Sequence, residues 1–207
     1  MRICARAHIF GEPGAAGQAE SGRRHGYVTA VTTAVRAVRH SGLDMEREVP
    51  DRVGVIWGSG IGGIGTHEEQ HTVYMEKGPA RVSPFYVPMM ISDMAPGMIS
   101  MRLGAKGPNF AAVSACASAG HAIGLSGRSI QWGEAEVMIC GGSEAAVTPI
   151  SIAGFASARA LSVRNLEPTR ASRPFDAGRD GFVLAEGAGG LVLEELEHAR
   201  SRGADIL

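Results

Sequence analysis

Apolar residues recur along the chain at two different spacings, and these spacings predict alternating helices and strands. A valine at every third or fourth position from 28 to 38 predicts a helix over 26–41. Short continuous apolar runs, which are typical of buried strands, lie at 52–57, 110–114 and 136–140. Strands that alternate with helices indicate an α/β fold.

The remaining segments complete this picture. Further helices are expected at 66–77, at 89–103 with an interruption at Pro96, at 116–132 and at 195–202. The segment 116–132 is small and apolar almost all round, which predicts a buried helix. Two apolar runs, 181–188 and 189–196, are joined through glycine and predict adjacent antiparallel strands. Residues 1–25 are rich in glycine and predict a flexible or atypical start without an initial strand.

Composition excludes several classes of protein. The 207 residues are 44% hydrophobic, and the 20 basic residues nearly balance the 21 acidic ones, so no overall charge favours nucleic acid or a membrane surface. No apolar run approaches the roughly 20 residues of a membrane span. Cys4, Cys116 and Cys140 lie far apart and form no CxxC pair, which favours a reducing, cytoplasmic setting.

A glycine pattern follows the predicted strand at 52–57. Gly58, Gly60 and Gly63 match the G-x-G-x-x-G fingerprint of dinucleotide-binding folds, and Glu76 lies near the position of a ribose-binding acid. That fold needs a second strand ending in the acid, whereas Glu76 lies at the end of a predicted helix. We therefore favour a tight glycine turn that lines a cavity.

The next helix contains a literal HExxH motif, from His67 to His71. Two histidines four residues apart on a helix can hold zinc, with the glutamate as a base. A third ligand is needed, and the extended form of the motif would place Gly at 74 and His at 77, where the chain has Tyr74 and Lys77. The helix is polar, so we favour a solvated face and expect no metal.

A cysteine stands where a predicted strand turns into a predicted helix. Cys116 follows the strand at 110–114, and the N–H groups and dipole of a helix N-terminus favour a thiolate there. Such a thiolate can accept an acyl group, and its own N–H can help to stabilise an oxyanion. A small buried cysteine that fills the start of a helix is an equally good explanation of these residues alone.

Seven longer segments carry a more specific signal. They are GSGIGG at 58–63, KGPARVSPFYVP at 77–88, GAKGPN at 104–109, VSACASAGHAIG at 113–124, GGSEAAVTPISIAGFASARALS at 141–162, ASRPFDAGRDGFVLAEGAG at 171–189 and LVLEELEHARSRGA at 191–204. With them, the stretch from Asp51 to Ile206 resembles the bacterial ketoacyl-ACP synthase II family, the elongating condensing enzymes of fatty-acid synthesis.

The resemblance implies a fold, a reaction and partners. The fold is thiolase-like, in which two similar halves stack as alternating helix and sheet layers. Residues 26–207 match the N-terminal half, incomplete at both ends. The implied reaction loads an acyl chain from acyl carrier protein onto a cysteine and condenses it with decarboxylated malonyl-ACP. The family is usually homodimeric and needs no cofactor beyond the phosphopantetheine of the carrier protein.

The resemblance also assigns roles to individual residues. Cys116 matches the nucleophile, Gly60 and Ile61 match glycine-turn positions that border the acyl pocket, and Phe155 matches an aromatic position on its other side. Arg159 matches a basic position near the carrier-protein entrance.

The chain departs from the family pattern in its second half. Two histidines, a lysine and a glycine-rich oxyanion loop are expected there and are not found within the 207 residues, so we expect the chain alone to be inactive. His121 is expected to be a packed structural histidine that points away from Cys116. Cys140 is expected in the core, and Glu144 and Glu186 are expected to anchor turns or to pair at a dimer interface.

Two alternatives to the fatty-acid synthase remain open from the sequence. A polyketide-type ketosynthase shares the same motifs. A truncated subunit that only dimerises, without catalysis, would also carry them.

Overall fold

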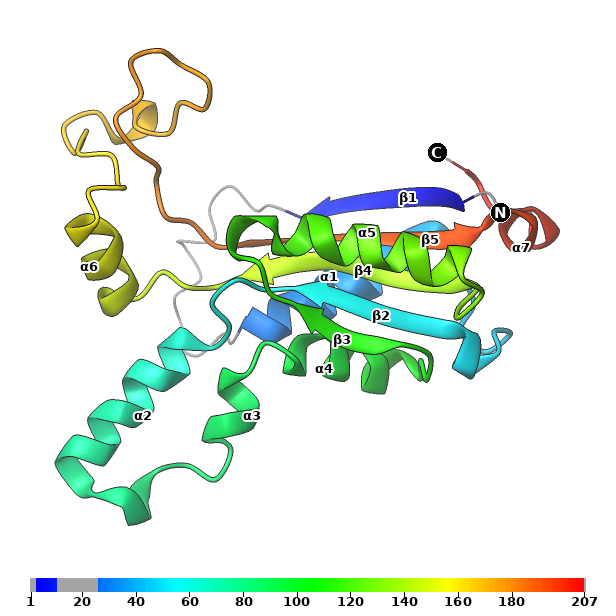
Figure 1. Cartoon of the computed structure of the whole chain (residues 1–207), viewed down its shortest axis with the longest axis horizontal. Coiled ribbons are helices and arrows are strands. Elements are labelled where there is room, and N and C mark those ends of the chain that lie inside the picture. Colours follow the sequence, from blue (N-terminus) through cyan, green and yellow to red (C-terminus); the bar gives the residue numbers. More distant parts are fainter. Residues whose placement is uncertain (1–2, 11–25, 207) are drawn as a thin grey trace.

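The computed structural model describes residues 3–10 and 26–206, and its centre is a five-stranded sheet (Figure 1). The strands are β1 (Ile3–Phe10), β2 (Val53–Gly58), β3 (Asn109–Ala112), β4 (Val137–Glu144) and β5 (Gly187–Glu195). They follow the order β1-β5-β4-β2-β3. The three strands β3, β2 and β4 run parallel, whereas β5 is antiparallel to both β4 and β1.

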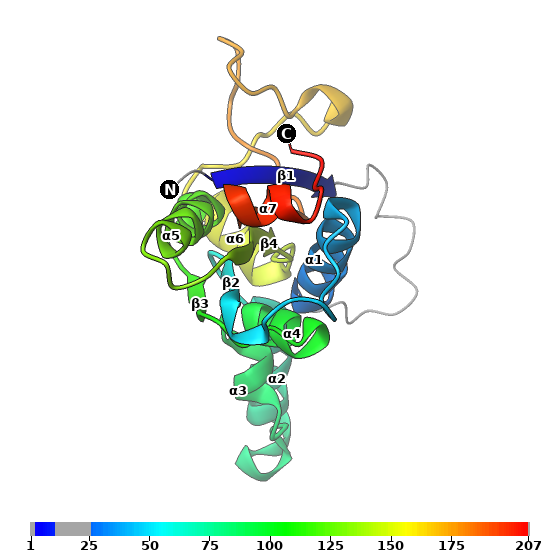
Figure 2. The same cartoon turned by 90° about the vertical axis from the view of Figure 1, so that its right-hand side faces the viewer.

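Helices cover both faces of the sheet. The helices of the described residues are α1 (Gly26–Ser41), α2 (Ile64–Lys77), α3 (Tyr86–Met90), α4 (Met94–Leu103), α5 (Ser118–Gln131), α6 (Pro149–Ser157) and α7 (Leu196–Ser201), and three of them cover the sheet. Helices α1 and α4 pack on one face and α5 packs on the other (Figure 2). This arrangement confirms the α/β class expected from the alternating pattern.

The sheet separates two apolar clusters, because successive side chains of a strand point to opposite faces. In β2, Val55 and Trp57 are fully buried against α1 and α4, while Ile56 is buried on the α5 side. Strand β4 repeats the pattern with Ile139 on the first face and Met138 on the second. Burial of each such large side chain contributes about 1.5–3 kcal/mol, so the alternating side chains of β2 and β4 stabilise the packing of helices on both faces of the sheet.

The expectation that the chain lacks an initial strand is wrong. Residues 3–10 form β1, which pairs with β5 over its whole length, from Ile3 opposite Glu195 to Phe10 opposite Ala188. A pairing between segments so far apart in the sequence leaves no local pattern. The glycine-rich remainder of the expected flexible start, 11–25, lies outside the described residues.

The expectation that residues 181–196 form an antiparallel pair of strands is also wrong. Only Gly187–Glu195 forms a strand, and Phe182 makes an isolated bridge to Leu161. The partners of β5 are β1 and β4, with Gly141 opposite Gly190 in the β4 pairing. Strand β4 accordingly continues through its glycines to Glu144 instead of ending at Cys140, because the two strands approach closely at glycine.

Two expected helices differ from their sequence pattern. The segment at 89–103 breaks at 91–93, before Pro96, which lies in the first turn of α4, where a missing N–H costs no hydrogen bond. Helix α5 is not buried all round: Ala122 and Ile130 are fully buried, while His121 and Leu125 are exposed. Only the stripe that meets the sheet is covered within the described residues.

The segments that follow β2 and β4 leave the body of the molecule. Helices α2 and α3 form an arm, and α6 with the loop after it extends from the same end of the sheet (Figure 1). This is the end at which the parallel strands finish. Among the described residues, no helix is long and apolar enough to cross a membrane.

Candidate active site at the carboxyl ends of the parallel strands

The carboxyl ends of β2, β3 and β4 surround a cleft of ≈ 570 Å³, which we call the cysteine cleft. Parallel neighbours finish at one edge of a sheet, and the loops that follow them converge there. The cleft is lined by Gly58, Ser59, Gly60, Ile61, Ala115, Cys116, Ser118, Ala119, Gly142, Ser143, Glu144, Phe155, Phe182, Leu184, Gly187, Ala188 and Gly189. The lining is largely apolar, and Glu144 is the only charged residue among the described residues that form it.

Cys116 lies in a sharp turn between β3 and α5. We call residues 113–117 the cysteine turn. Ala115 has a left-handed backbone, with φ 51°, which costs a non-glycine residue about 1–2 kcal/mol. The thiol of Cys116 is free and exposed to the cleft, and no acceptor for its backbone N–H lies among the described residues. The turn therefore presents a thiol and an unused N–H donor at the same place.

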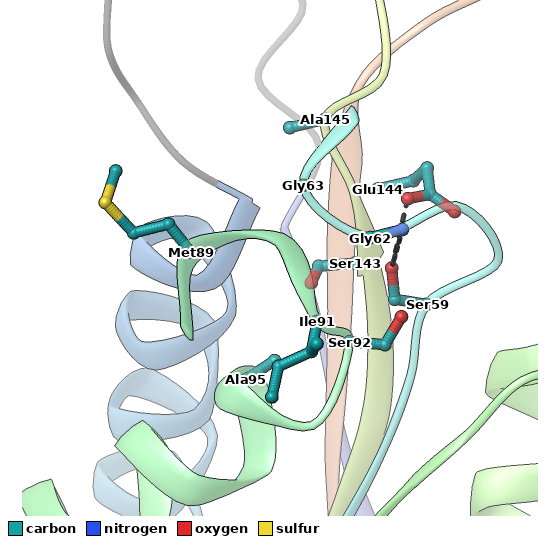
Figure 3. Close-up of a pocket in the computed structure, with 10 residues that line it drawn as sticks. All are labelled: Ser59, Gly62, Gly63, Met89, Ile91, Ser92, Ala95, Ser143, Glu144 and Ala145. Carbon is teal, nitrogen blue, oxygen red and sulfur yellow. Dashed lines mark hydrogen bonds between the residues drawn. The ribbon is translucent and has the colours of Figure 1, made fainter. Parts of the chain in front are cut away.

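Residues 58–63, the glycine turn, are organised by the carboxylate of Glu144. The N–H groups of Gly60 and Ile61 donate to its Oε2 at 2.7 and 3.1 Å, and the hydroxyl of Ser59 donates to its Oε1 at 3.1 Å. The N–H of Gly62 donates in turn to the Ser59 oxygen at 3.1 Å (Figure 3). The turn-anchoring role expected for Glu144 is confirmed.

The glycines are required by close packing at the start of α5. A Cβ on Gly58 would lie 2.5 Å from the backbone N of Ala119, and one on Gly142 would lie 2.6 Å from the Cβ of Ala119. A Cβ on Gly60 would lie 3.2 Å from the carbonyl oxygen of Ala115. The glycine pattern thus marks a cavity-lining turn, as we favoured over a dinucleotide site.

Phe155 and Arg159 lie in the segment that follows β4. Phe155 is half-buried on the side of the cleft formed by α6, and its ring meets that of Phe182 edge to face, with centroids 5.1 Å apart. Arg159 is exposed beyond the end of α6, with φ 55°. The structure therefore brings Cys116, Gly60, Ile61 and Phe155 into one cleft and places Arg159 outside its lining.

The HExxH motif lies on α2, away from the cysteine cleft. The Nδ1 atom of His67 is 2.6 Å from the hydroxyl of Tyr86, and the rings of His67 and His71 stack with centroids 6.2 Å apart. The described residues contain no group of three or more His, Cys, Asp or Glu side chains that could hold a metal ion. The zinc interpretation therefore has no third ligand in this part of the chain.

The structure decides the remaining candidates individually. The expectation that His121 is packed is wrong, because its ring is exposed and its Nδ1 lies 2.5 Å from the Ser114 hydroxyl. Cys140 is a core residue, as expected, and burial raises the pKa of its thiol to about 12. Glu186 anchors a turn, since the Val147 N–H donates to its Oε1 at 3.2 Å.

Two serines of the site were not anticipated from the sequence. Ser59 links Glu144 to the glycine turn, and Ser118 bonds the backbone of the cysteine turn. For Ser118 the available signal was a serine at the start of a helix, where its hydroxyl commonly bonds nearby backbone groups. That signal does not show which backbone groups are bound.

Comparison with known proteins identifies the family of this chain. A family model described as the N-terminal domain of beta-ketoacyl synthase matches residues 25–199. The chain belongs to the beta-ketoacyl synthase family. The 3-oxoacyl-[acyl-carrier-protein] synthase 2 of Synechocystis sp. is 54% identical over 177 residues, which cover 86% of this chain and 42% of that protein. The protein of the same name from Vibrio harveyi is 51% identical over 176 residues, 85% of this chain and 42% of its own length.

Solved beta-ketoacyl synthase structures share the fold. A beta-ketoacyl synthase from Burkholderia phymatum STM815 matches with a TM-score of 0.79 and 33% identity, over 95% of this chain and 48% of that one. The ketosynthase of a type II polyketide synthase, in complex with its acyl-carrier protein, matches with a TM-score of 0.83 and 31% identity, over 90% and 47%. The likeness confirms the thiolase-like architecture expected. The chain spans less than half the length of the curated relatives it matches.

Proposed function

We propose that this beta-ketoacyl synthase chain provides the acyl-accepting half of a 3-oxoacyl-[acyl-carrier-protein] synthase of fatty-acid elongation. The observation that carries the proposal is Cys116, a free and exposed thiol at a strained turn that opens into a largely apolar cleft. Relatives named 3-oxoacyl-[acyl-carrier-protein] synthase 2 are 51–54% identical to the chain, which favours the fatty-acid reaction.

The proposed chemistry has two steps. The Cys116 thiolate attacks the thioester carbonyl of an acyl-carrier protein, the carbon–sulfur bond to phosphopantetheine breaks, and that sulfur leaves with the proton lost by Cys116. Malonyl-ACP then loses CO₂, and its carbanion attacks the acyl carbonyl, which releases the Cys116 thiolate. The backbone N–H of Cys116 is placed to donate to the oxyanion of either step.

The acyl groups arrive on a carrier in this proposal, so no resident cofactor is needed. The glycine turn and Phe155 would border the acyl chain, because both line the cleft that contains Cys116. The nucleophile must remain a reduced thiol, which supports a cytoplasmic location.

The proposed partner is acyl carrier protein, docked near Arg159. Carrier proteins of this kind are strongly acidic, and Arg159 presents an exposed cation after α6, the helix that carries Phe155. Long-range attraction would steer association and weaken at high salt. In a full-length enzyme, Arg159→Glu should raise the KM for acyl-ACP at low salt and leave the KM for a short acyl thioester unchanged. An equal effect on both substrates would rule out this docking role.

We also propose a homodimer formed through the free edge of the sheet. Strand β3 ends the sheet, and Phe110 within it and Val113 just beyond it are 39% and 62% exposed. An uncovered edge strand beside apolar side chains is a surface that proteins usually cover. Sedimentation of the chain as a monomer at all concentrations would contradict this proposal.

The experiment that tests the function is covalent labelling followed by an assay of condensation. Cerulenin, an epoxide that alkylates the nucleophile of condensing enzymes, should label Cys116 saturably in the full-length enzyme, and Cys116→Ala should abolish elongation of acyl-ACP. Absence of labelling would support the alternative of a non-catalytic dimerisation partner. Elongation by the 207-residue chain alone would contradict the need for groups in a second half, which we expect to contribute about 10²–10⁴-fold each.

A polyketide-type ketosynthase is the second candidate function. It is favoured by one comparison, since a solved polyketide ketosynthase bound to its acyl-carrier protein shares the fold at 31% identity. The two functions predict different products. Repeated condensation without reduction of the keto groups would support the polyketide reaction over the fatty-acid one.

A further inference from the structure

Ser118, the first residue of α5, ties together the backbone of the cysteine turn. Its side-chain oxygen accepts the N–H of Ser114 at 2.9 Å and donates to the carbonyl of Ala115 at 2.7 Å. One hydroxyl has a single proton to donate and lone pairs to accept, so both bonds form together. Ser118 is 3% exposed, and water does not compete for either bond.

The two bonds enclose the strained part of the turn. Ala115 is left-handed at φ 51°, and Ser114 before it has φ −153° and ψ 47°. A non-glycine residue keeps such a backbone only where its surroundings hold it there. The Ser118 hydroxyl bonds the N–H of Ser114 and the carbonyl of Ala115, which are the backbone groups on either side of the peptide that joins these two residues, just before Cys116.

The start of α5 is held separately from the turn. The backbone of Ser118 and Ala119 rests on Gly58, where a Cβ would lie only 2.5 Å from either residue, and the side chain of Ala119 rests on Gly142. This backbone packing does not involve the Ser118 hydroxyl. Removal of that hydroxyl should therefore release the cysteine turn while the helix stays on the sheet.

We infer that Ser118 is a positioning residue, whose hydroxyl holds the cysteine turn in its left-handed form and so aims the Cys116 thiol into the cleft. The role of Ser118 in catalysis rests on the proposed acyl transfer to Cys116. Its effect on the reactivity of the Cys116 thiol does not depend on that proposal and can be measured on the 207-residue chain. Ser118 touches neither the substrate nor the reacting atoms in this role; it acts through the geometry of residues 114–116.

The experiment compares Ser118→Ala with a matched control on the same helix, Ser126→Ala. Both serines are buried on α5, and both variants remove one hydroxyl, but Ser126 lies two turns beyond the cysteine turn. The rate constant for alkylation of Cys116 by iodoacetamide is measured in the 207-residue chain by peptide mass spectrometry. Far-ultraviolet circular dichroism of each variant verifies that α5 and the sheet are retained.

We expect Ser118→Ala to slow alkylation of Cys116 about three- to tenfold, because the released turn would hold the thiol in the open cleft for only part of the time. Ser126→Ala should react at the rate of the unmodified chain. Ser118→Thr, which keeps the hydroxyl, should recover most of the rate. An unchanged rate in Ser118→Ala, or an equal loss in the control, would overturn the positioning role.

A separate measurement isolates the proposed function. Transfer of a short acyl group from an acyl thioester to Cys116 is followed by intact-protein mass spectrometry in the full-length enzyme. If the unmodified enzyme accepts no acyl group, the proposed function fails, while the alkylation comparison still decides the role of Ser118. If it does, Ser118→Ala should lower the maximal rate of acylation and leave the apparent affinity for the thioester unchanged, because Ser118, although it lines the cleft, is only 3% exposed and offers almost no surface to the acyl group.

Discussion

Replacement of Gly58 by alanine tests the close approach of α5 to the sheet. The added Cβ would lie 2.5 Å from the backbone of Ser118 and Ala119. An ordinary contact is about 3.5 Å, so the start of the helix must move by about 1 Å. Backbone atoms cannot rotate away as a flexible side chain can, and forced overpacking of this kind costs about 1–3 kcal/mol.

The assay is unfolding of the 207-residue chain by heat and by urea. For a protein of this size, the loss corresponds to a decrease in Tm of about 3–10 °C. Gly124→Ala is the matched control, because Gly124 lies within α5 and, apart from the helix's own nearby backbone, no described atom lies within 4 Å of an added Cβ. Alanine favours the helix interior by up to about 1 kcal/mol, so the control should raise Tm. A Gly58→Ala chain as stable as the unmodified one would refute the packing argument.

Three further predictions concern charged and thiol groups. Glu144→Ala should lower the free energy of unfolding by about 1–3 kcal/mol, because two N–H donors of the glycine turn lose their acceptor, and Glu144→Gln, which keeps an oxygen, should lose less than half as much in the same urea titration. The hydroxyl of Ser162 and neighbouring donors lower the pKa of Asp180 in the folded chain. The contribution of the Asp180 carboxylate to folding stability is therefore present above its pKa in the unfolded chain, and it is lost as the pH falls through its pKa in the folded chain. Asp180→Asn should accordingly be less stable at pH 6, with the difference shrinking once the pH falls below the ordinary carboxyl pKa of 3.8; a constant difference would contradict this cause. Because burial raises the pKa of Cys140 to about 12, iodoacetamide at pH 8 should modify it only after unfolding, which peptide mass spectrometry with and without urea can show.

The sequence predicted the elements whose evidence is local. The valine spacing located α1, and the apolar runs at 52–57 and 136–140 located β2 and β4, because burial on both faces of a central strand requires a continuous apolar run. The order of elements then gave the α/β class. The longer motifs predicted the family, which the comparisons confirm.

Pairings between distant segments could not be predicted in the same way. Strand β1 is a strand because β5 pairs with it, although more than 170 residues separate them. Strand β5 has no hairpin partner at 181–186, since β4 takes that place through opposed glycines, and the pattern of each run alone was equally consistent with a local pair. Hydrogen-bond partners across a sheet are chosen by the whole chain, which local spacing does not record.

For the candidate site, the sequence by itself determined which residue types are present, and the tertiary structure decided what each one does. A cysteine at a turn between strand and helix was visible in the sequence, but equally consistent with a buried structural residue. Its exposure, the left-handed Ala115 and the bonds from Ser118 and Glu144 arise only when three parallel strands end at one edge of the sheet. These contacts join residues far apart in the chain and depend on shifts of about an ångström, a precision that packing determines and that residue type and spacing cannot encode.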